Sequence, residues 1–274
     1  MRRVRNGVYI LLGLLVAAVW LFPVYWMATT AIKPGRDMYS AQPQLIPLHP
    51  TMQHINRVLD DPAFWQALRN SATVTAITVV FAMVVAFLSA VAVARFDFRG
   101  RKAFLASVLV VQLVPHVALI IPLFLALSGL GFADTLTGLV IAYLAFAMPF
   151  AVWTMRGFVA GVPRELEEAA MIDGCTPLQA FRRVTLPLVL PGLIATSIFT
   201  MILSWNEYLV AYFLTSSPDR YTLPLWLTHF ITSEGAEFGP LMAGSTLIAL
   251  PVAICFALAQ RNLAHGLTAG AVKG

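Results

Sequence analysis

The chain has 274 residues, of which 59% are hydrophobic and only 11% are charged. Water-soluble domains carry about a quarter charged residues, so this composition excludes that class. The mean hydropathy of +0.80 agrees. A net charge of +5 does not indicate a nucleic-acid partner, because the basic residues lie singly between apolar blocks. The two cysteines and five dispersed histidines form neither a disulfide framework nor a metal site. The composition therefore predicts an integral membrane protein.

Six apolar blocks are long enough to cross about 30 Å of hydrocarbon as helices. None contains Lys or Arg, and none alternates apolar with polar residues as barrel strands do. The sequence therefore predicts an all-α polytopic fold, with six transmembrane helices in a single domain over residues 1–274. The first block could be read as a cleaved leader, but its length indicates a retained helix. The expected spans are 8–32, 71–94, 103–127, 136–155, 188–214 and 241–260.

The distribution of Lys and Arg predicts the orientation, because cytoplasmic loops carry an excess of them. With the N-terminus inside, thirteen of the 18 fall in inside segments, so both termini are predicted to be cytoplasmic. The inside residues are Arg2, Arg3, Arg5, Arg95, Arg99, Arg101, Lys102, Arg156, Arg164, Arg182, Arg183, Arg261 and Lys273, and the outside residues are Lys33, Arg36, Arg57, Arg69 and Arg220.

Two outside segments, 33–70 and 215–240, are longer than the usual connections between packed helices. The first becomes amphipathic around Phe64, Trp65 and Leu68, which predicts an interfacial helix with aromatic anchors. The alternative is a docking surface for an extracytoplasmic partner.

The cytoplasmic connection 156–187 is also long, and it contains the signals of two short helices. Pro163 is suited to the start of the first helix, and Gly174 to the left-handed position that closes it. Thr176 and Gln179 have the spacing of a capping box at the start of the second. The first helix is acidic and rich in alanine, unlike the basic helices that lie on membranes. This loop is therefore predicted to be a knob that docks into another protein, with a pair of interfacial helices as the alternative.

At this loop the sequence resembles the EAA loop of ATP-binding-cassette importer permeases. Glu168, Ala169 and Ala170 are followed at the family spacing by Gly174, by Val184 in place of the usual Ile, and by Leu186-Pro187. The resemblance extends over the whole chain. Asn70-Ser71, Trp205-Asn206-Glu207 and the ending Gly266–Gly274 are similar to MalG-like carbohydrate permeases.

The resemblance implies a bacterial or archaeal cell-membrane protein that is half of a translocation pathway. It implies three kinds of partner besides membrane lipid: a second, MalF-like permease, two ATP-binding cassette subunits and an extracytoplasmic substrate-binding protein. The residues that it assigns to coupling with the ATPase are Glu168, Ala169, Ala170, Asp173, Gly174, Phe181, Leu186 and Pro187.

The chain lacks the motif of an ATPase. A Walker A loop needs a Gly-Lys pair, and Lys33, Lys102 and Lys273 all follow other residues. We therefore expect this chain to be no enzyme and to bind no cofactor or metal, with ATP and Mg used by the partner ATPase subunits.

Four residues are candidates for the substrate pathway, because polar groups inside a membrane usually face a partner or water. They are Glu207 first, then Asn206, Trp205 and His116. The alternative for Asn206 and Glu207 is that they fix the packing of the fifth span, and for His116 that it bonds a neighbouring helix or the carbonyl freed by Pro115.

The expected function is import of a sugar or sugar derivative, driven by ATP. Related permeases carry glycerophosphodiesters or polyol phosphates, and this cargo is the main alternative, although no span contains an arginine for a phosphate. An ion-coupled secondary transporter would need more intramembrane acids than Glu207 alone. A membrane-embedded enzyme would need a convergent catalytic set, which the spans do not show.

Overall fold

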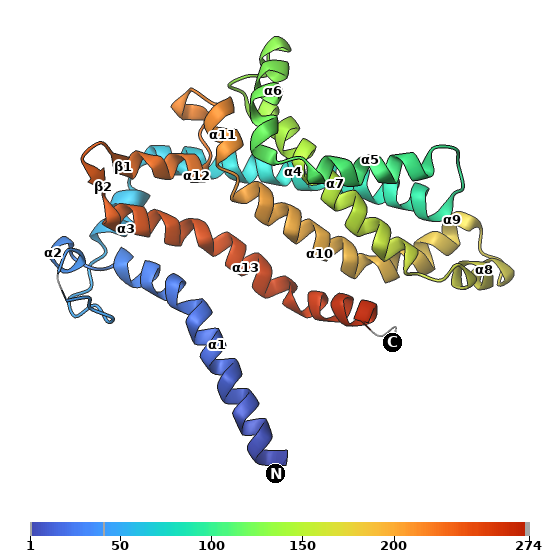
Figure 1. The fold of residues 1–274 in the computed structure, drawn as a ribbon, viewed down its shortest axis with the longest axis horizontal. Helices are drawn as coiled ribbons and strands as arrows, with labels where there is room; N and C mark the ends of the chain where they lie inside the picture. Colours follow the sequence, from blue (N-terminus) through green and yellow to red (C-terminus); the bar gives the residue numbers. More distant parts are fainter. Residues whose placement is uncertain (1, 41, 272–274) are drawn as a thin grey trace. The chain divides into compact units, whose positions relative to one another are not determined.

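The structure, a computed structural model, describes residues 2–40 and 42–271. These residues are mainly helical, with one short antiparallel hairpin of β1 (Ile231–Thr232) and β2 (Gly235–Ala236) (Figure 1). The all-α prediction is confirmed. The end of the family-like C-terminus, Val272–Gly274, with the predicted inside residue Lys273, lies outside the described residues.

Five of the described helices are long and apolar enough to cross a membrane. Hydrocarbon offers no hydrogen-bond partner to the backbone, so such segments must satisfy their own amides and carbonyls as helices. Their apolar stretches are Tyr9–Ala31 of α1 (Arg2–Ala31), Pro62–Arg95 (α4), Leu136–Ala160 (α7), Pro177–Trp205 ending in α10 (Leu186–Trp205), and Phe238–Gln260 of α13 (Phe238–Ala271).

The third expected span, 103–127, is not one straight helix. It consists of α5 (Arg101–Leu113) and α6 (His116–Gly129), which are bent by 103° at their junction. Pro115 has no amide proton to continue the helix, and it forces the preceding Val114 into an extended conformation with ψ 124°. The number of spans is six when this bent pair counts as one.

The fifth expected span, 188–214, is interrupted as well. Helix α10 ends at Trp205, and a short helix α11 (Leu209–Leu214) follows after a break at Asn206–Tyr208. The expected span 188–214 placed Trp205, Asn206 and Glu207 on one continuous helix. In the structure the helix ends at Trp205, and Asn206 and Glu207 lie in the break.

The second span begins earlier than expected. Helix α4 starts at Pro62 rather than at 71, and the Oδ1 atom of Asp61 accepts a hydrogen bond of 2.9 Å from the amide of Ala63. The amphipathic stretch around Phe64, Trp65 and Leu68 is thus the first part of α4 and not a separate interfacial helix.

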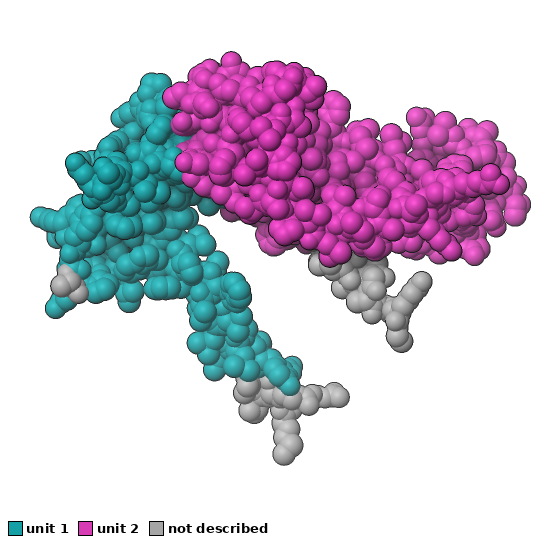
Figure 2. Space-filling view, turned by 45° about the horizontal axis from the view of Figure 1, so that its top comes forward, with its two compact units in different colours: residues 1–65, 226–251 teal, residues 66–225, 252–274 magenta. Residues whose placement is uncertain are grey.

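The described chain divides into two compact units, residues 1–65 with 226–251 and residues 66–225 with 252–274 (Figure 2). The first unit also contains α2 (Gly35–Met38), α3 (Gln53–Leu59) and the 3₁₀ turn Leu227–Phe230. The second also contains α8 (Arg164–Ile172), α9 (Pro177–Ala180), the π-helical turn Phe181–Thr185, the 3₁₀ turn Pro218–Arg220 and most of α12 (Leu223–Trp226). The organisation as a single permease domain stays a prediction.

In the first unit, the side chain of Trp226 is at the centre of the packing. Its ring lies edge-on to Phe64 and Phe230, with centroids 5.3 and 5.1 Å away, and its Nε1 donates to Asp61 at 3.2 Å. Gly244 of α13 packs against it, and an added Cβ there would meet Leu227 and Trp226. The tryptophan therefore connects the start of α4 to α13.

In the second unit, a row of alanines lets α4 approach its neighbours closely. Ala82, Ala86, Ala90 and Ala94 recur every four residues along one face and are all buried. They form a core with residues of α7 and α10, including Met155 and Val189. Small residues at this spacing are the usual contact surface between helices in lipid, where the hydrophobic effect does not drive association.

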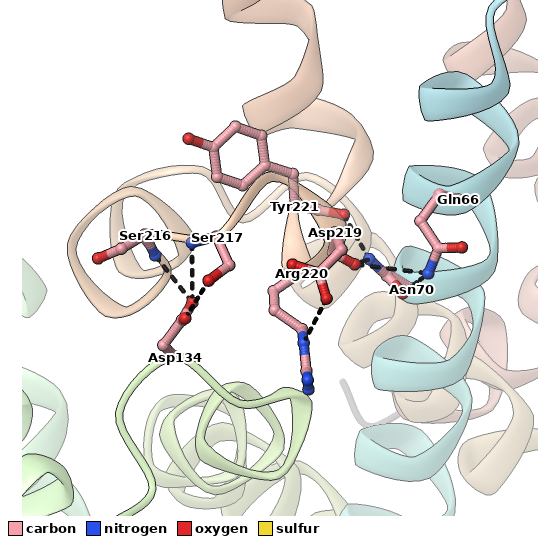
Figure 3. A network of polar contacts seen from close by, with 8 residues as sticks. All are labelled: Gln66, Asn70, Asp134, Ser216, Ser217, Asp219, Arg220 and Tyr221. Carbon is pink, nitrogen blue, oxygen red and sulfur yellow. Dashed lines mark hydrogen bonds and ion pairs between the residues drawn. The ribbon is translucent and has the colours of Figure 1, made fainter.

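The second unit fastens its outer loop to α4 through side-chain amides. Asn70 donates from Nδ2 to the carbonyls of Asp219 and Tyr221, both at 2.9 Å (Figure 3). The hydroxyl of the next residue, Ser71, accepts from the amide of Leu223 at 2.8 Å. The Asn70-Ser71 pair, which the sequence analysis noted as family-like, thus replaces the missing backbone partners of a loop.

The same loop is held from the other side by Asp134, between α6 and α7. Its carboxylate accepts hydrogen bonds from the amides of Ser216 and Ser217, at 2.9 and 3.0 Å, and from the hydroxyl of Ser217 (Figure 3). The Ser217 bonds lower the pKa of Asp134 below its ordinary value. The folded state therefore favours the ionised carboxylate.

We expect Asp134→Asn to destabilise the protein at pH 7, because the amide accepts fewer and weaker bonds. The stabilisation is present above the unfolded pKa of about 3.9 and is lost as pH falls through the lower folded pKa, so the difference from wild type should shrink below about pH 4. A loss of about 1 kcal/mol lowers the unfolding midpoint by about 2–4 °C. A thiol-reactive dye on Cys175 and Cys255 reports unfolding in detergent.

The matched control is Asp97→Asn, because that carboxylate is 86% exposed and pairs with Arg101 at the surface. It should leave the midpoint unchanged at every pH. An equal effect of the two substitutions would contradict a specific role of Asp134.

Candidate functional site

The cytoplasmic knob, residues 163–187, begins with α8 and turns sharply after it. The amide of Gly174 bonds the carbonyl of Met171, and the amide of Cys175 bonds that of Ala170, both at 3.0 Å. This pair of bonds is the Schellman motif, which needs a left-handed residue between them. Gly174 has φ +92°, so the predicted left-handed glycine is confirmed.

The second helix of the knob begins with the predicted capping box. The amide of Gln179 donates to the hydroxyl of Thr176, and the amide of Thr176 donates to the Gln179 side chain at 2.8 Å. Pro177 occupies the first turn, where its missing amide proton costs nothing. After α9 the chain widens into the π-helical turn Phe181–Thr185 and continues without a break into α10.

The knob is attached to the spans by an ion pair that the sequence analysis missed. Arg95, the last residue of α4, lies 2.8 Å from the carboxylate of Glu167 on α8, and both side chains are largely shielded from solvent. The same guanidinium donates two bonds of 3.1 Å to the carbonyl of Val162. The hydroxyl of Thr185, on the π-helical turn, donates to Glu167 as well. A second arginine, Arg164, donates to the carbonyls of Ala94 and Arg95.

These contacts join the end of α4, α8 and the start of α10 into one body. A charged hydrogen bond with little solvent competition is among the stronger polar interactions in proteins. The sequence offers one sign of this ion pair, because Arg95 is the charged residue that directly follows the apolar second span. The partner is 72 positions away in sequence, so spacing alone does not reveal it.

The outer surface of the knob exposes apolar side chains. The side chain of Ile172 is 86% exposed and that of Leu178 is 61% exposed. Leu166 and Met171, on the first of the two helices, are each more than a third exposed. Isolated exposed apolar residues are common, but a group on two consecutive short helices indicates a contact surface. Glu168, Ala169 and Asp173 are exposed on the same two-helix unit.

Not all of the predicted coupling residues face outward. Gly174 and Pro187 are exposed, whereas Ala170 and Leu186 are half-buried. Phe181 is half-buried too, and its ring lies 5.9 Å from that of Phe87 on α4. Phe181 is therefore placed to hold the knob against α4.

The candidate pathway residues are only partly brought together. A small pocket of about 50 Å³ in the second unit is lined by His116 from α6, by residues of α7 and α10, and by Glu207. The ring of His116 stacks on Phe146 of α7 at 4.8 Å. Trp205 is buried in the same unit but does not line the pocket, and Asn206 is exposed and donates to the carbonyl of Ile202.

Glu207 occupies the break between α10 and α11. Its Oε1 accepts a hydrogen bond of 2.9 Å from the amide of Val210, one of the unpaired amides at the start of α11. Its backbone carbonyl accepts a bond of 3.3 Å from the hydroxyl of Tyr143 on α7. The carboxylate therefore caps a helix and borders a pocket that holds one or two waters, which is too small for a sugar.

Comparison with known proteins gives the family. Binding-protein-dependent transport system inner membrane components match residues 82–269, which include the knob and the pocket. The chain belongs to this family. It is accordingly an integral cell-membrane protein, and the EAA pattern at residues 168–187 is typical of the sugar permeases among its relatives.

The family members most similar to the chain include two permeases for small sugars. The diacetylchitobiose uptake system permease protein DasC of Streptomyces coelicolor is 43% identical over 93% of this chain and 92% of its own length. The trehalose transport system permease protein SugB of Mycobacterium tuberculosis is 35% identical over 98% of each chain. A solved bacterial ABC transporter for import of the acidic polysaccharide alginate contains a chain with TM-score 0.78 and 25% identity, covering 94% of this chain and 96% of that one.

In this family member, Gly174 can be tested by substitution. An added Cβ would meet no atom within 4 Å, so its only cost is the left-handed backbone, about 1–2 kcal/mol. We expect Gly174→Ala to lower the unfolding midpoint and Gly174→Asn to lower it less, because Asn tolerates this conformation better.

The matched control is Gly157→Ala in α7, where an added Cβ also meets nothing within 4 Å and the backbone is helical. Alanine is favoured over glycine in a helix by about 0.5–1 kcal/mol, so this midpoint should not fall. A similar loss in both variants would mean that the turn does not need a left-handed residue.

Proposed function

We propose that this chain is the permease subunit of an ATP-driven, binding-protein-dependent importer of a sugar or sugar derivative. It forms half of the translocation pathway together with a second, MalF-like permease. Two ATP-binding cassette subunits bind ATP and Mg and dock from the cytoplasm, and an extracytoplasmic substrate-binding protein delivers the cargo. The chain itself supplies no catalytic site.

The observation that carries this proposal is the knob. It presents exposed apolar residues outward, and the Arg95–Glu167 pair together with Thr185 joins it to two spans. A docked ATPase that moves the knob thereby moves α4 and α10 together. In this interpretation Glu168, Ala169, Ala170, Asp173 and Gly174 form the docking surface, and Phe181, Leu186 and Pro187 form its junction with the span.

The sugar cargo is supported by the named substrates of DasC and SugB, which are neutral disaccharides. Sugars need such a route because each hydroxyl transferred to hydrocarbon without a partner costs several kcal/mol. Wild-type cells should accumulate at least one of three sugars, diacetylchitobiose, trehalose or maltose. Deletion of the chain should abolish the cellular uptake of that sugar. Uptake of all three at wild-type rates after deletion would overturn the proposal.

Ala169→Arg should abolish uptake while the protein remains in the membrane, because Ala169 is exposed on the docking surface and arginine adds bulk and charge there. Co-purification of the ATPase subunit, or its stimulation by cargo, should fall at least about tenfold. The matched control is Ala103→Arg, an exposed alanine on α5. Normal coupling in Ala169→Arg, or an equal loss in both variants, would contradict a docking role.

For the pathway we propose that Glu207 and His116 line the route, with Asn206 and Trp205 secondary. Glu207→Gln keeps an acceptor for the Val210 amide, so we expect unchanged thermal stability and a KM for uptake raised at least about threefold. The matched control is Asp97→Asn, because Asp97 is an exposed carboxylate that does not line the pocket, and this substitution should leave KM within twofold. A fall in stability with unchanged per-complex transport would make Glu207 a structural cap only.

A further inference from the structure

The first unit contains a pocket of about 290 Å³ that neither the coupling loop nor the pathway residues explain. It lies between the end of α1, residues 33–40 and 43–44, and the start of α13. Its volume is near the lower end of the range of about 300–1,000 Å³ for small-molecule sites. It is also about ten times the volume of one liquid water, roughly 30 Å³. The positive-inside prediction places this end of α1 outside the cell.

Three buried polar atoms on the lining residues have no hydrogen-bond partner among the described residues. They are Thr30 Oγ1, Asp37 Oδ2 and Gln44 Oε1. Thr30 is only 8% exposed, so its hydroxyl lies away from bulk solvent. A buried polar atom without a partner costs about 1–3 kcal/mol, so three such atoms around one cavity indicate a ligand that supplies their hydrogen bonds. All three accept, and two have no proton to give, so the ligand must be rich in donors.

The charges of the pocket favour a neutral ligand. Of its described lining residues only Lys33 and Asp37 are charged, and their signs are opposite. The Lys33 ammonium lies 4.0 Å from the centroid of the Trp26 ring, and the side chain is almost fully buried. Burial lowers the pKa of Lys33, while nearby Asp37 opposes the shift. A cationic ligand would be repelled by the ammonium of Lys33, and an anionic ligand by the carboxylate of Asp37. A neutral hydroxylated molecule is repelled by neither group.

The remaining walls are aromatic and apolar. Trp26 borders one part, and Tyr39 lies edge-on to Phe238 of α13 with ring centroids 6.3 Å apart. Ring faces carry negative potential and attract the C–H groups of a polyol ring. Donor-poor apolar ligands would leave the three acceptors unpaired.

The backbone around the pocket is fixed before any ligand arrives. The carbonyl of Lys33 accepts from Nε2 of His54 at 3.1 Å, and the carbonyl of Ile32 accepts from the amide of Thr51 at 2.8 Å. His54 in turn packs against Gly239 of α13, where an added Cβ would meet its ring. A preformed cavity avoids much of the ordering cost of binding.

We propose that this pocket binds one neutral sugar ring on the outer side of the chain, through Thr30, Asp37 and Gln44 and the rings of Trp26, Tyr39 and Phe238. The choice of a sugar over another neutral polyol rests on the proposed function. The site is a place where a sugar contacts this permease between the end of α1, the residues that follow α1 and the start of α13.

The test is binding of tritiated maltose, trehalose and diacetylchitobiose to the purified full chain in lipid nanodiscs. Thr30→Val and Gln44→Leu should each weaken the Kd of the bound sugar about fivefold, the size expected for one hydrogen bond. Both remove a partnerless buried atom, so neither should lower the unfolding midpoint. Gln42→Leu is the matched control, since Gln42 is exposed two residues from Gln44 and does not line the pocket.

No binding of any of the three sugars to wild type, or equal affinities in Gln42→Leu and Gln44→Leu, overturns the site. A fall in the unfolding midpoint of both pocket variants also overturns it, because the atoms would then have structural partners. The deletion experiment on uptake judges the proposed function separately. Loss of sugar binding with uptake intact would refute only the site, and sugar binding by a chain whose deletion leaves uptake intact would refute only the importer.

Discussion

The ion pair between Arg95 and Glu167 is the interaction on which the inner end of the second unit depends. The last carbonyl groups of a helix need hydrogen-bond donors from outside the helix. At the end of α4, Arg164 donates to the carbonyls of Ala94 and Arg95. The guanidinium of Arg95 in return bonds the carbonyl of Val162, just before α8. The carbonyl groups at the end of α4 and just before α8 are therefore hydrogen-bonded by arginine side chains of the protein rather than by water. The rigidity of the knob follows from this closed set of bonds.

The alanine row on α4 continues the same connection along the span. Because Ala82, Ala86 and Ala90 are small, this part of α4 packs closely with residues of α7 and α10 in one core. Phe181 packs on Phe87 where this row meets the knob. A displacement of the knob is thus resisted by the packing of residues 82–94 and not by the ion pair alone, because packed interiors transmit strain.

The sequence predicted most of the fold, because the features that define it are local. Apolar blocks, the capping box at Thr176 and the left-handed Gly174 depend on residues within a few positions of one another. The errors occurred where composition stayed apolar while the backbone changed. The carbonyl freed by Pro115 was recognised, but the apolar sequence around it gave no sign of a 103° bend between α5 and α6. The end of α10 at Trp205 had no signal of its own, since Asn206 and Glu207 also fit a polar helix face.

The candidate sites were less predictable, for a different reason. The EAA motif lies within one short stretch of sequence, so it could be recognised directly. The ion pair Arg95–Glu167 joins residues 72 positions apart, and the hydrogen bond from Asn70 to the carbonyl of Tyr221 joins residues 151 positions apart. The outer pocket is harder still, because its Thr, Asp and Gln become informative only once their neighbours are known to leave them unpaired.

The π-helical turn at Phe181–Thr185 has a consequence for how such loops change length. A π turn closes with i→i+5 bonds and so accommodates about one residue more than an α turn. A chain with one residue fewer between Gly174 and Leu186 could run straight into α10 as an ordinary helix. Because the π turn holds one more residue within nearly the same rotation as an α turn, the residues before the deletion would keep nearly the same orientation around the helix axis. The orientation of the knob relative to α10 therefore tolerates a difference of one residue in the length of this loop.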